Sequence, residues 1–468
     1  MSRTDAAGLP LELDSAAAVD AWNGCVRGFL AHAAETPARL GAALTAAPGF
    51  ALGHAAMGFF QFLLGRRETH EAARAAQARA VKAAAGGGGD ARTAAYLDAL
   101  ADALDGRLFA SADRLDAILR RWPGDALALK LGHAIRFLLG DAAGMRRAVE
   151  AAAAGFGEGH PYGGYALGCH AFALEETGAY AQAEAQGRAG VALAADDAWG
   201  LHAVAHVCEM TARPRDGVAL LRGAAGAWAH CNNFGAHVWW HLALFHLDRG
   251  AFEPALLLYD ARIRAARTDD YRDIANAASL LARLELEGVG VGARWEELAE
   301  LAAARVNDGG NVFADLHYLI ALDRAGRRAE AARLAARLKA DGARGAGDMD
   351  AVAGEVGAPV AEGLRLFADG AHRAAFAKLH AASDSLQRVG GSHAQRDVFA
   401  RLMVAAALKA GLWAEAERAL ARRPGLRPAA GADGYIARRR AEIARGAAPD
   451  AAGRDAAQHV SPAYRLHA

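Results

Sequence analysis

Apolar residues recur along the chain at the three- and four-residue spacing of amphipathic helices, and short breakers interrupt this pattern at regular intervals. Successive breakers lie 34 to 44 residues apart. Because glycine readily adopts the left-handed conformation that ends a helix, each breaker predicts a tight turn between two helices. The central residues of the breakers are Gly65, Gly106, Gly140, Gly178, Arg213, Gly250, Gly288, Gly326, Gly370 and Gly411.

A repeat of this length is typical of tetratricopeptide-like units. We therefore expect an all-α fold, an α-solenoid of about ten helical hairpins, with the first helix of each hairpin on the concave side. The superhelix is expected to span residues 1–422, and residues 423–468 to form a C-terminal capping helix, near 436–445, and a polar tail. The glycine-rich stretches 86–90 and 342–357 predict loops or hinges.

Composition agrees with helices and limits the function classes. Alanine is the most frequent residue, which favours closely packed helices over a β-sandwich. The 53 basic residues balance 53 acidic ones, so charge gives no support for a nucleic-acid partner or an anionic membrane partner. No apolar run reaches the roughly 18–20 residues of a membrane span, and the first residues lack a signal-peptide pattern. These features predict a cytoplasmic protein.

Histidine is concentrated in one part of the chain, where eight of the 18 histidines lie between residues 160 and 246. His202 and His206 are four residues apart and Glu209 follows three residues later, so all three share one helical face. His237 and His241 repeat the spacing on the next first helix. Imidazole and carboxylate groups in such a pattern suit metal ligation or proton transfer. We take His202, His206, Glu209 and His241 as candidate catalytic residues and leave the metal and any cofactor open.

Other residues are candidates for ligand binding because they lie on the same predicted faces or at helix entries. A structural interpretation competes with each of them, since buried imidazoles often hydrogen-bond to a neighbouring helix and tryptophans often fill the core. These candidates are His54, His160, Tyr162, His170, His237, Trp240, His393 and Arg396.

Gly390 and Gly391 precede a segment that contains a serine, a histidine and an aspartate. A Ser-His-Asp arrangement is disfavoured because Ser392 and its neighbour His393 point in different directions. Ser392 and Gln395 instead have the spacing of a capping box, which predicts that a helix begins here.

Several long motifs make the chain resemble the tetratricopeptide repeat protein 38 family over residues 22–422. The resemblance implies an α-solenoid of divergent repeats and no established reaction or substrate. The motifs run from Gly53 to Met57, from His160 to Tyr162 with Glu175 and Glu176 downstream, from Asp197 to Met210, from Trp239 to His246, and from Gly390 to Phe399.

Two classes of function are compatible with this pattern. A binding scaffold would hold a protein or peptide partner in an open, histidine-lined concave groove. An enzyme or small-molecule binder would instead close around the histidines and form a cavity of several hundred Å³. The repeat architecture favours the scaffold by a narrow margin, and the aligned histidines favour the pocket.

Overall fold

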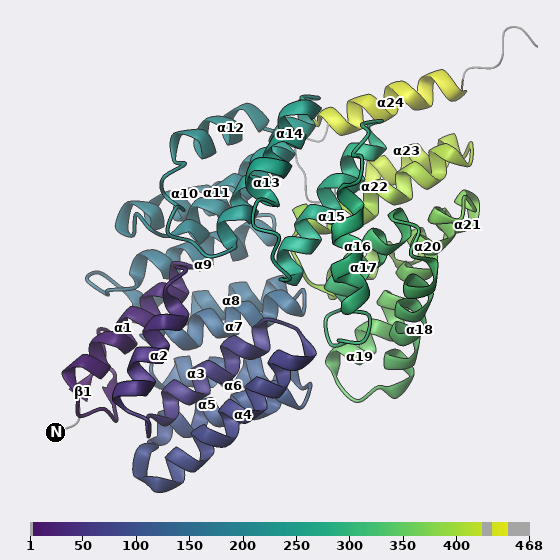
Figure 1. Cartoon of the computed structure of the whole chain (residues 1–468). Helices are drawn as coiled ribbons and strands as arrows, with labels where there is room; N and C mark the ends of the chain where they lie inside the picture. The colour runs from purple at the N-terminus through teal and green to yellow at the C-terminus, as the bar shows by residue number, and fades with distance from the viewer. Residues whose placement is uncertain (1–2, 424–432, 448–468) are drawn as a thin grey trace, which may run out of the picture.

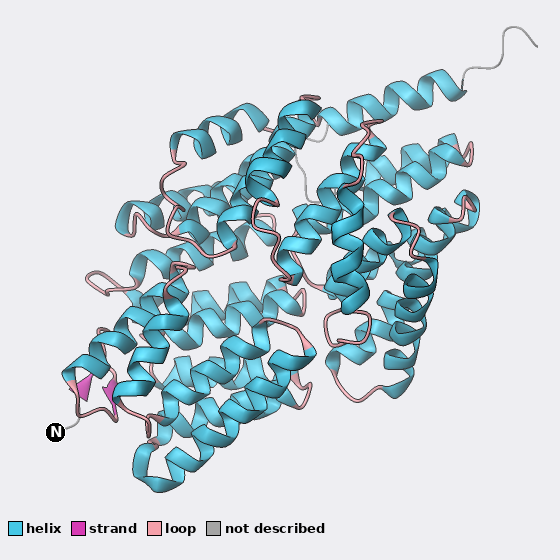
Figure 2. Ribbon diagram, in the orientation of Figure 1, coloured by secondary structure: helices cyan, strands magenta, loops and turns pink. Residues whose placement is uncertain are grey.

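The computed structural model describes residues 3–423 and 433–447, which are almost entirely helical (Figure 2). The one sheet found in these residues is a short antiparallel pair at the N-terminus, β1 (Arg3–Thr4) and β2 (Pro10–Leu11). The all-α prediction is confirmed. Within the same residues, no helix has the length and apolar character needed to cross a membrane.

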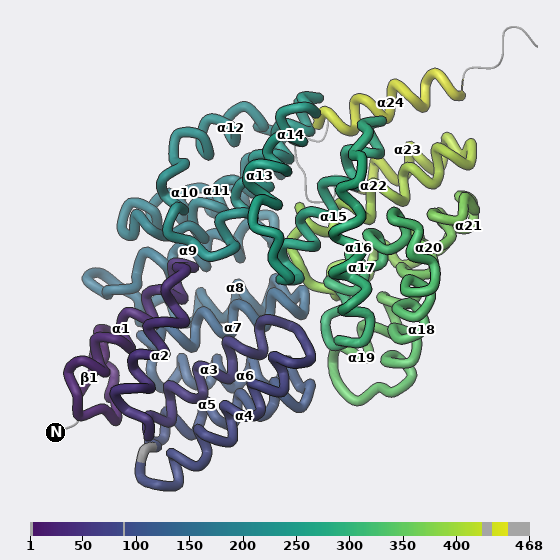
Figure 3. Tube along the Cα trace, in the orientation of Figure 1, coloured from purple at the N-terminus to yellow at the C-terminus, as the bar shows by residue number. Residues whose placement is uncertain are grey.

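The helices fall into three consecutive groups, which Figure 3 allows the reader to follow along the chain. The first group comprises α1 (Ala16–Leu30), α2 (Thr36–Ala46), α3 (Ala51–Leu63), α4 (Arg67–Ala83), η1 (Ala84–Gly88), α5 (Ala91–Leu104), α6 (Leu108–Arg121), α7 (Ala126–Leu138), α8 (Ala142–Ala152) and η2 (Ala153–Phe156). The second comprises α9 (Gly163–Glu176), α10 (Tyr180–Leu193), α11 (Ala198–Met210), α12 (Pro214–Gly223), α13 (Phe234–Asp248), α14 (Phe252–Leu258) and η3 (Tyr259–Ile263).

The third group comprises α15 (Tyr271–Leu286), α16 (Arg294–Ala304), α17 (Val312–Arg324), α18 (Arg328–Arg344), α19 (Asp348–Val352), η4 (Ala353–Gly357), α20 (Ala358–Ala368), α21 (His372–Ala382), η5 (Ser383–Val389), α22 (His393–Lys409), α23 (Trp413–Arg422) and α24 (Gly434–Ala447). Figure 1 shows α1–α8 and α15–α23 on opposite sides of the view, with α9–α14 between them at the top.

All ten predicted turns lie between consecutive helices. The nine glycines at these turns have φ between 64° and 83°, the left-handed conformation that an alanine would adopt only with strain. At the turn marked by Arg213 the left-handed residue is Ala212, with φ of 53°. The position of the helix ends therefore follows from local backbone chemistry.

The prediction of a loop over 342–357 is wrong, because most of this stretch is helical in α18, α19 and η4. Gly342 and Gly354 face each other so closely that a Cβ atom on Gly342 would lie 2.2 Å from the Gly354 Cα atom. These glycines allow two helical segments to touch through their backbones. Close packing, rather than a loop, accounts for the glycine content. The other predicted loop, 86–90, lies at the end of η1, where Gly87 has φ of 97°.

Two contacts join parts of the chain that are far apart in the sequence. The backbone N–H of Ala34 donates a hydrogen bond to the carbonyl of His230 at 2.9 Å. Glu68, at the start of α4, binds Arg305 at 2.7 Å. The early helices are thereby joined to the segments before α13 and after α16.

The C-terminal helix α24 includes the predicted helix at 436–445 and packs against the preceding helices. Arg438 donates to Glu287 at 2.9 Å, and Tyr435 is fully buried. The predicted polar tail falls on residues 448–468, which lie outside the described residues.

Candidate functional site

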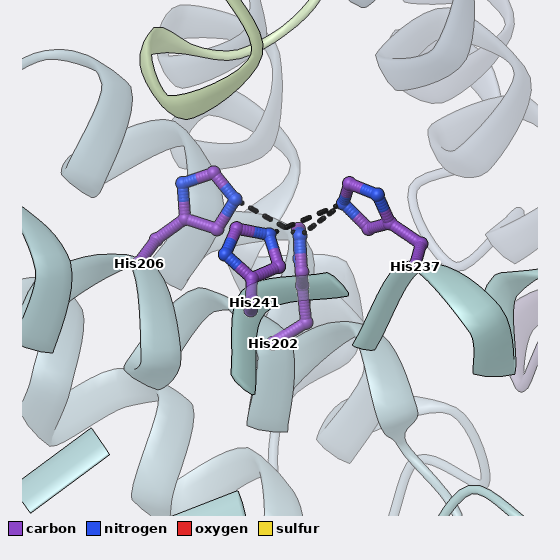
Figure 4. A group of neighbouring side chains, drawn as sticks. All are labelled: His202, His206, His237 and His241. Carbon is purple, nitrogen blue, oxygen red and sulfur yellow. Dashed lines mark hydrogen bonds between the residues drawn. The ribbon is translucent and has the colours of Figure 1, made fainter. Parts of the chain in front are cut away.

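Four histidines from two neighbouring helices meet at one point (Figure 4). His202 and His206 lie one turn apart on α11, and His237 and His241 have the same spacing on α13. The Nε2 atom of His202 is 2.9 Å from the Nε2 atoms of both His206 and His237. The Nε2 atom of His241 is 3.2 Å from that of His237. The structure thus brings the two i,i+4 pairs together, and we call these four residues the histidine cluster.

The opposite ring nitrogen of three of these histidines faces an oxygen atom. His206 Nδ1 lies 3.4 Å from Glu175 Oε2, and His241 Nδ1 lies 3.4 Å from Glu209 Oε2. His237 Nδ1 lies 3.2 Å from the side-chain oxygen of Asn276.

Asn276 is held in this orientation by Gln395, whose amide N–H donates to the same oxygen at 3.4 Å. The capping box predicted at the start of α22 is confirmed, and it places this glutamine at the first turn, where it and Ser392 close the box. The histidine cluster therefore has an outer layer of acceptors contributed by α9, α11 and α15.

Small residues explain how α9 comes close enough to supply Glu175. A Cβ atom on Gly168 of α9 would lie 2.1 Å from the Asp197 carboxylate and 3.1 Å from the Gly200 Cα atom of α11. Glycine at both positions lets the two helices approach almost backbone to backbone. About two turns further along each helix, Glu175 and His206 then face each other.

Burial controls the electrostatics of the histidine cluster. Desolvation, and next the proximity of the other imidazoles, lower the pKa values of His202, His237 and His241 well below the usual value. Burial, followed by the charge of Glu176, raises the pKa of Glu175 well above its usual value. Neutral imidazoles with free lone pairs are the form in which histidine binds metal ions.

A cavity of about 310 Å³ adjoins the histidine cluster. His202 and His237 line it, whereas His206 and His241 lie behind them. Its wall comes mostly from α1, α3, α7, α11, α13, α15 and α17 and is mainly apolar. The aromatic lining residues are Phe29, Phe60, Phe137, Trp199, Phe234, Tyr271 and Phe313.

Lys130 is an unusual member of the cavity wall. Its side chain is 96% buried on α7, and its ammonium group lies 4.4 Å from the centre of the Trp199 ring. Within residues 3–423 and 433–447, no carboxylate oxygen lies within 4 Å of this ammonium group. The other lining cation, Arg272, is bound by Asp270 through two short hydrogen bonds. Lys130 thus presents a buried positive charge to the cavity.

The cavity also has a carboxyl group in Asp273. Asn233 donates a hydrogen bond to it at 3.2 Å, and the Thr268 hydroxyl donates another. Burial raises the pKa of Asp273 to about 6. The Asp273 carboxyl group is therefore hydrogen-bonded within the protein, unlike the Lys130 ammonium group, which has no such ion-pair partner among the described residues.

Several predicted ligand-binding residues lie away from the cavity. The His54 ring donates to the Pro48 carbonyl at 2.9 Å, and the His160 ring accepts from the backbone N–H of Tyr162 at 3.2 Å. His170 lies 3.5 Å from the Glu150 carboxylate near the surface. The positions of His54, His160, Tyr162 and His170 fit the structural interpretation, because each is occupied with local contacts.

The other predicted residues support the site from behind. The Trp240 ring stacks on His237, with centroids 5.3 Å apart, and is fully buried in the core. His393 donates its backbone N–H to Glu176 at 2.8 Å, and Arg396 binds the same carboxylate at 3.2 Å. These two residues therefore hold the acid next to Glu175 rather than line the cavity.

Three important residues were not among the candidates from sequence. Glu175 and Asn276 lie on other helices, and their approach to the histidines depends on tertiary packing alone. Lys130 could have been selected from the sequence, because the chain contains only five lysines and this one interrupts the largely apolar run from Ala126 to Ile135. A cation in such a run predicts either a buried ion pair or a ligand site.

No protein-family model matches the chain. We therefore infer function from the geometry of the site.

Proposed function

We propose that the helical hairpins form a tetratricopeptide-like α-solenoid, related to the tetratricopeptide repeat protein 38 family, whose interior binds a small molecule. The molecule is mostly apolar and carries one acidic group. Its apolar part lies among the aromatic rings of the cavity, and its acidic group pairs with Lys130. Of the two function classes compatible with the sequence, we therefore propose the small-molecule binder in place of the protein-binding scaffold.

The observation that carries the proposal is the buried ammonium group of Lys130 in an apolar wall. The buried acid Asp197 interacts with this charge, yet no carboxylate of the described residues lies within ion-pair distance of it. Burying a charge in this way is costly, so an anionic ligand would stabilise the arrangement. A cavity of about 310 Å³ falls within the size range of small-molecule sites.

The position of Lys130 also locates the acidic group. The centre of the Trp199 ring lies 4.4 Å from the Lys130 ammonium group and 5.0 Å from the centre of the His202 ring. An acidic group bound by Lys130 would therefore lie in the same cavity as His202 and His237, near the Trp199 ring that both Lys130 and His202 contact. The site can thus combine binding of an acid with imidazole chemistry, which is compatible with an enzyme as well as with a binding protein.

Binding of straight-chain carboxylates of increasing length, with the matching alcohols as neutral analogues, tests the proposal by titration calorimetry. We expect carboxylates to bind more tightly than alcohols. Lys130→Met, which keeps the length and apolar stem, should weaken carboxylate binding by about 10- to 100-fold, because a charge-assisted hydrogen bond contributes about 1.5–3 kcal/mol. The binding of alcohols should change little.

Lys339→Met is the matched control, since Lys339 is exposed on α18 and far in sequence from the cavity residues. It should bind carboxylates as the wild type does. Equal binding of acids by wild type and Lys130→Met, or no binding of any carboxylate, would overturn the proposal and leave the scaffold as the better interpretation.

A further inference from the structure

The short distances between ring nitrogens in the histidine cluster are difficult to explain if the cluster is only a hydrogen-bonded structural network. The Asn276 side-chain oxygen lies 3.2 Å from the Nδ1 atom of His237, and a Glu209 carboxylate oxygen lies 3.4 Å from that of His241, which favours the tautomer with the proton on Nδ1 in both rings. In a neutral imidazole the Nε2 atom then has a lone pair and no proton. The Nε2 atoms of His237 and His241 nevertheless face each other at 3.2 Å. Two acceptors at this distance repel unless a cation lies between them.

The same reasoning applies to the remaining pair. Glu175 lies 3.4 Å from the Nδ1 atom of His206, and where it accepts that N–H, the His206 Nε2 lone pair points inward. Where a protonated Glu175 donates instead, the Nε2 atom of His206 carries one hydrogen, which serves the contact with His202 alone. His202 could supply one N–H from its Nε2 atom, yet that atom lies 2.9 Å from two partners, His206 and His237. One proton can serve one of these contacts. A network of neutral imidazoles therefore leaves two of the three close contacts without a hydrogen.

A single metal ion resolves all three contacts, because it accepts the four lone pairs at once. With metal–nitrogen bonds of about 2.1 Å, neighbouring ligand atoms are separated by about 3.0 Å at right angles and about 3.4 Å in a tetrahedron. The three Nε2 separations of 2.9, 2.9 and 3.2 Å lie near these values. All four nitrogens also lie within 4.8 Å of one another, as ligands of one ion must.

The outer layer has the composition that is usual around metal-bound histidine. Such histidines donate their second N–H to a carboxylate or a carbonyl oxygen, which orients the ring and increases its basicity. Glu175, Glu209 and Asn276 provide this for three of the four rings. The positive charge of a divalent ion would in turn favour the ionised form of the two carboxyl groups beside these rings, those of Glu175 and Glu209.

We propose that His202, His206, His237 and His241 bind one divalent first-row transition-metal ion, with Glu175, Glu209 and Asn276 as positioning residues. An all-imidazole set suits zinc, cobalt, nickel, copper or iron and disfavours calcium and magnesium. His202 and His237 line the cavity, so the ion faces it from this side. Metal binding is independent of the cavity ligand proposed above, and the following test contains no ligand.

Protein stripped with a chelator and then titrated with Co²⁺ tests this proposal, because cobalt bound by nitrogen ligands gives visible absorption bands. We expect one Co²⁺ per chain, displaced by Zn²⁺, and one zinc per chain by elemental analysis after dialysis. His206→Gln and His241→Gln should each lose the bound metal after dialysis, with far-UV circular dichroism unchanged. Absence of cobalt bands in the folded wild type would overturn the proposal.

Two further variants keep the test decisive if a ligand variant fails to fold. Glu209→Gln retains all four histidines and should weaken metal binding by about 10- to 100-fold. His317→Gln is the matched control, because His317 is a fully buried histidine on α17 that contacts the Phe313 carbonyl at 2.7 Å. It should bind metal as the wild type does. Equal loss of metal in the His317 and Glu209 variants would show that folding, not ligation, is responsible.

Discussion

Two buried polar regions of this protein are built on opposite principles. At the C-terminal end, Asp397 accepts hydrogen bonds from Arg401 at 2.6 Å and from Arg423 at 2.5 Å, and Arg423 also binds Asp433 at 2.8 Å. The Tyr435 ring packs against both guanidinium groups. We call these residues the arginine network. These contacts of the arginine network join donors to acceptors of opposite charge, whereas in the histidine cluster the Nε2 atoms of four like groups face one another.

The difference indicates what each region needs in order to be stable. Complementary charges satisfy one another inside the chain, so the arginine network stabilises the fold without a further component. Four imidazoles that converge in a buried space have no such complementary charges and cannot satisfy one another in this way. A buried cluster whose close contacts cannot all be hydrogen bonds is a better candidate for function than one that is merely buried and charged.

Removing the acid at the centre of the arginine network should have the largest effect on stability. Asp397→Ala leaves Arg401 and Arg423 with less compensation, and breaking a buried ion pair from one side costs about 3–5 kcal/mol. We expect a correspondingly lower free energy of unfolding in urea. Asp384→Ala, which removes an exposed carboxylate, is the control. A small loss in the Asp397 variant would mean that this network is not structural.

The histidine cluster should respond to metal rather than to loss of a histidine alone. A saturating divalent ion at about 100 times its dissociation constant should stabilise the wild type by about 2.7 kcal/mol. His241→Leu should cancel this gain. Without metal, the same variant should change the free energy of unfolding by less than about 1 kcal/mol, because it removes a repulsive contact and keeps a similar volume. Thermal unfolding with and without Zn²⁺ measures both, and a large loss in metal-free His241→Leu would instead support a structural network.

Asp197 provides an intermediate case, a buried acid just before α11. Burial is the largest cause that raises its pKa to about 7, and the charge of Lys130 opposes this rise. Since the folded pKa lies above the unfolded value of about 3.9, the stability that its protonation contributes is present below that value. It is lost as pH rises through about 7.

We therefore expect Asp197→Asn, which cannot ionise, to lose less stability than the wild type between pH 5 and pH 8. The difference should be on the order of 1–3 kcal/mol at the upper pH. Urea unfolding at several pH values measures it. Parallel pH profiles for the two proteins would show that Asp197 is ionised in the folded protein.

The two regions also differ in how far sequence could predict them. The turns were predictable because a left-handed glycine is a local requirement, and the i,i+4 pairs His202–His206 and His237–His241 follow from helix geometry alone. The meeting of the two pairs, and the approach of Glu175 and Asn276, depend on how helices pack. Glycines that allow such packing resemble loop glycines in a sequence, which is why the 342–357 prediction failed.

Removing an exposed ion pair should change the free energy of unfolding least. This comparison tests whether the burial of ion pairs or their number determines stability. Arg418 and Glu415 lie one turn apart on α23, next to the arginine network, and pair at 3.1 Å. The Arg418 side chain is 67% exposed, so water already stabilises its charge. Arg418→Ala should change the free energy of unfolding by less than about 0.5 kcal/mol, the usual size for such a helical pair. If urea unfolding gave a loss close to that of Asp397→Ala, the number of ion pairs rather than their burial would determine stability in this part of the protein.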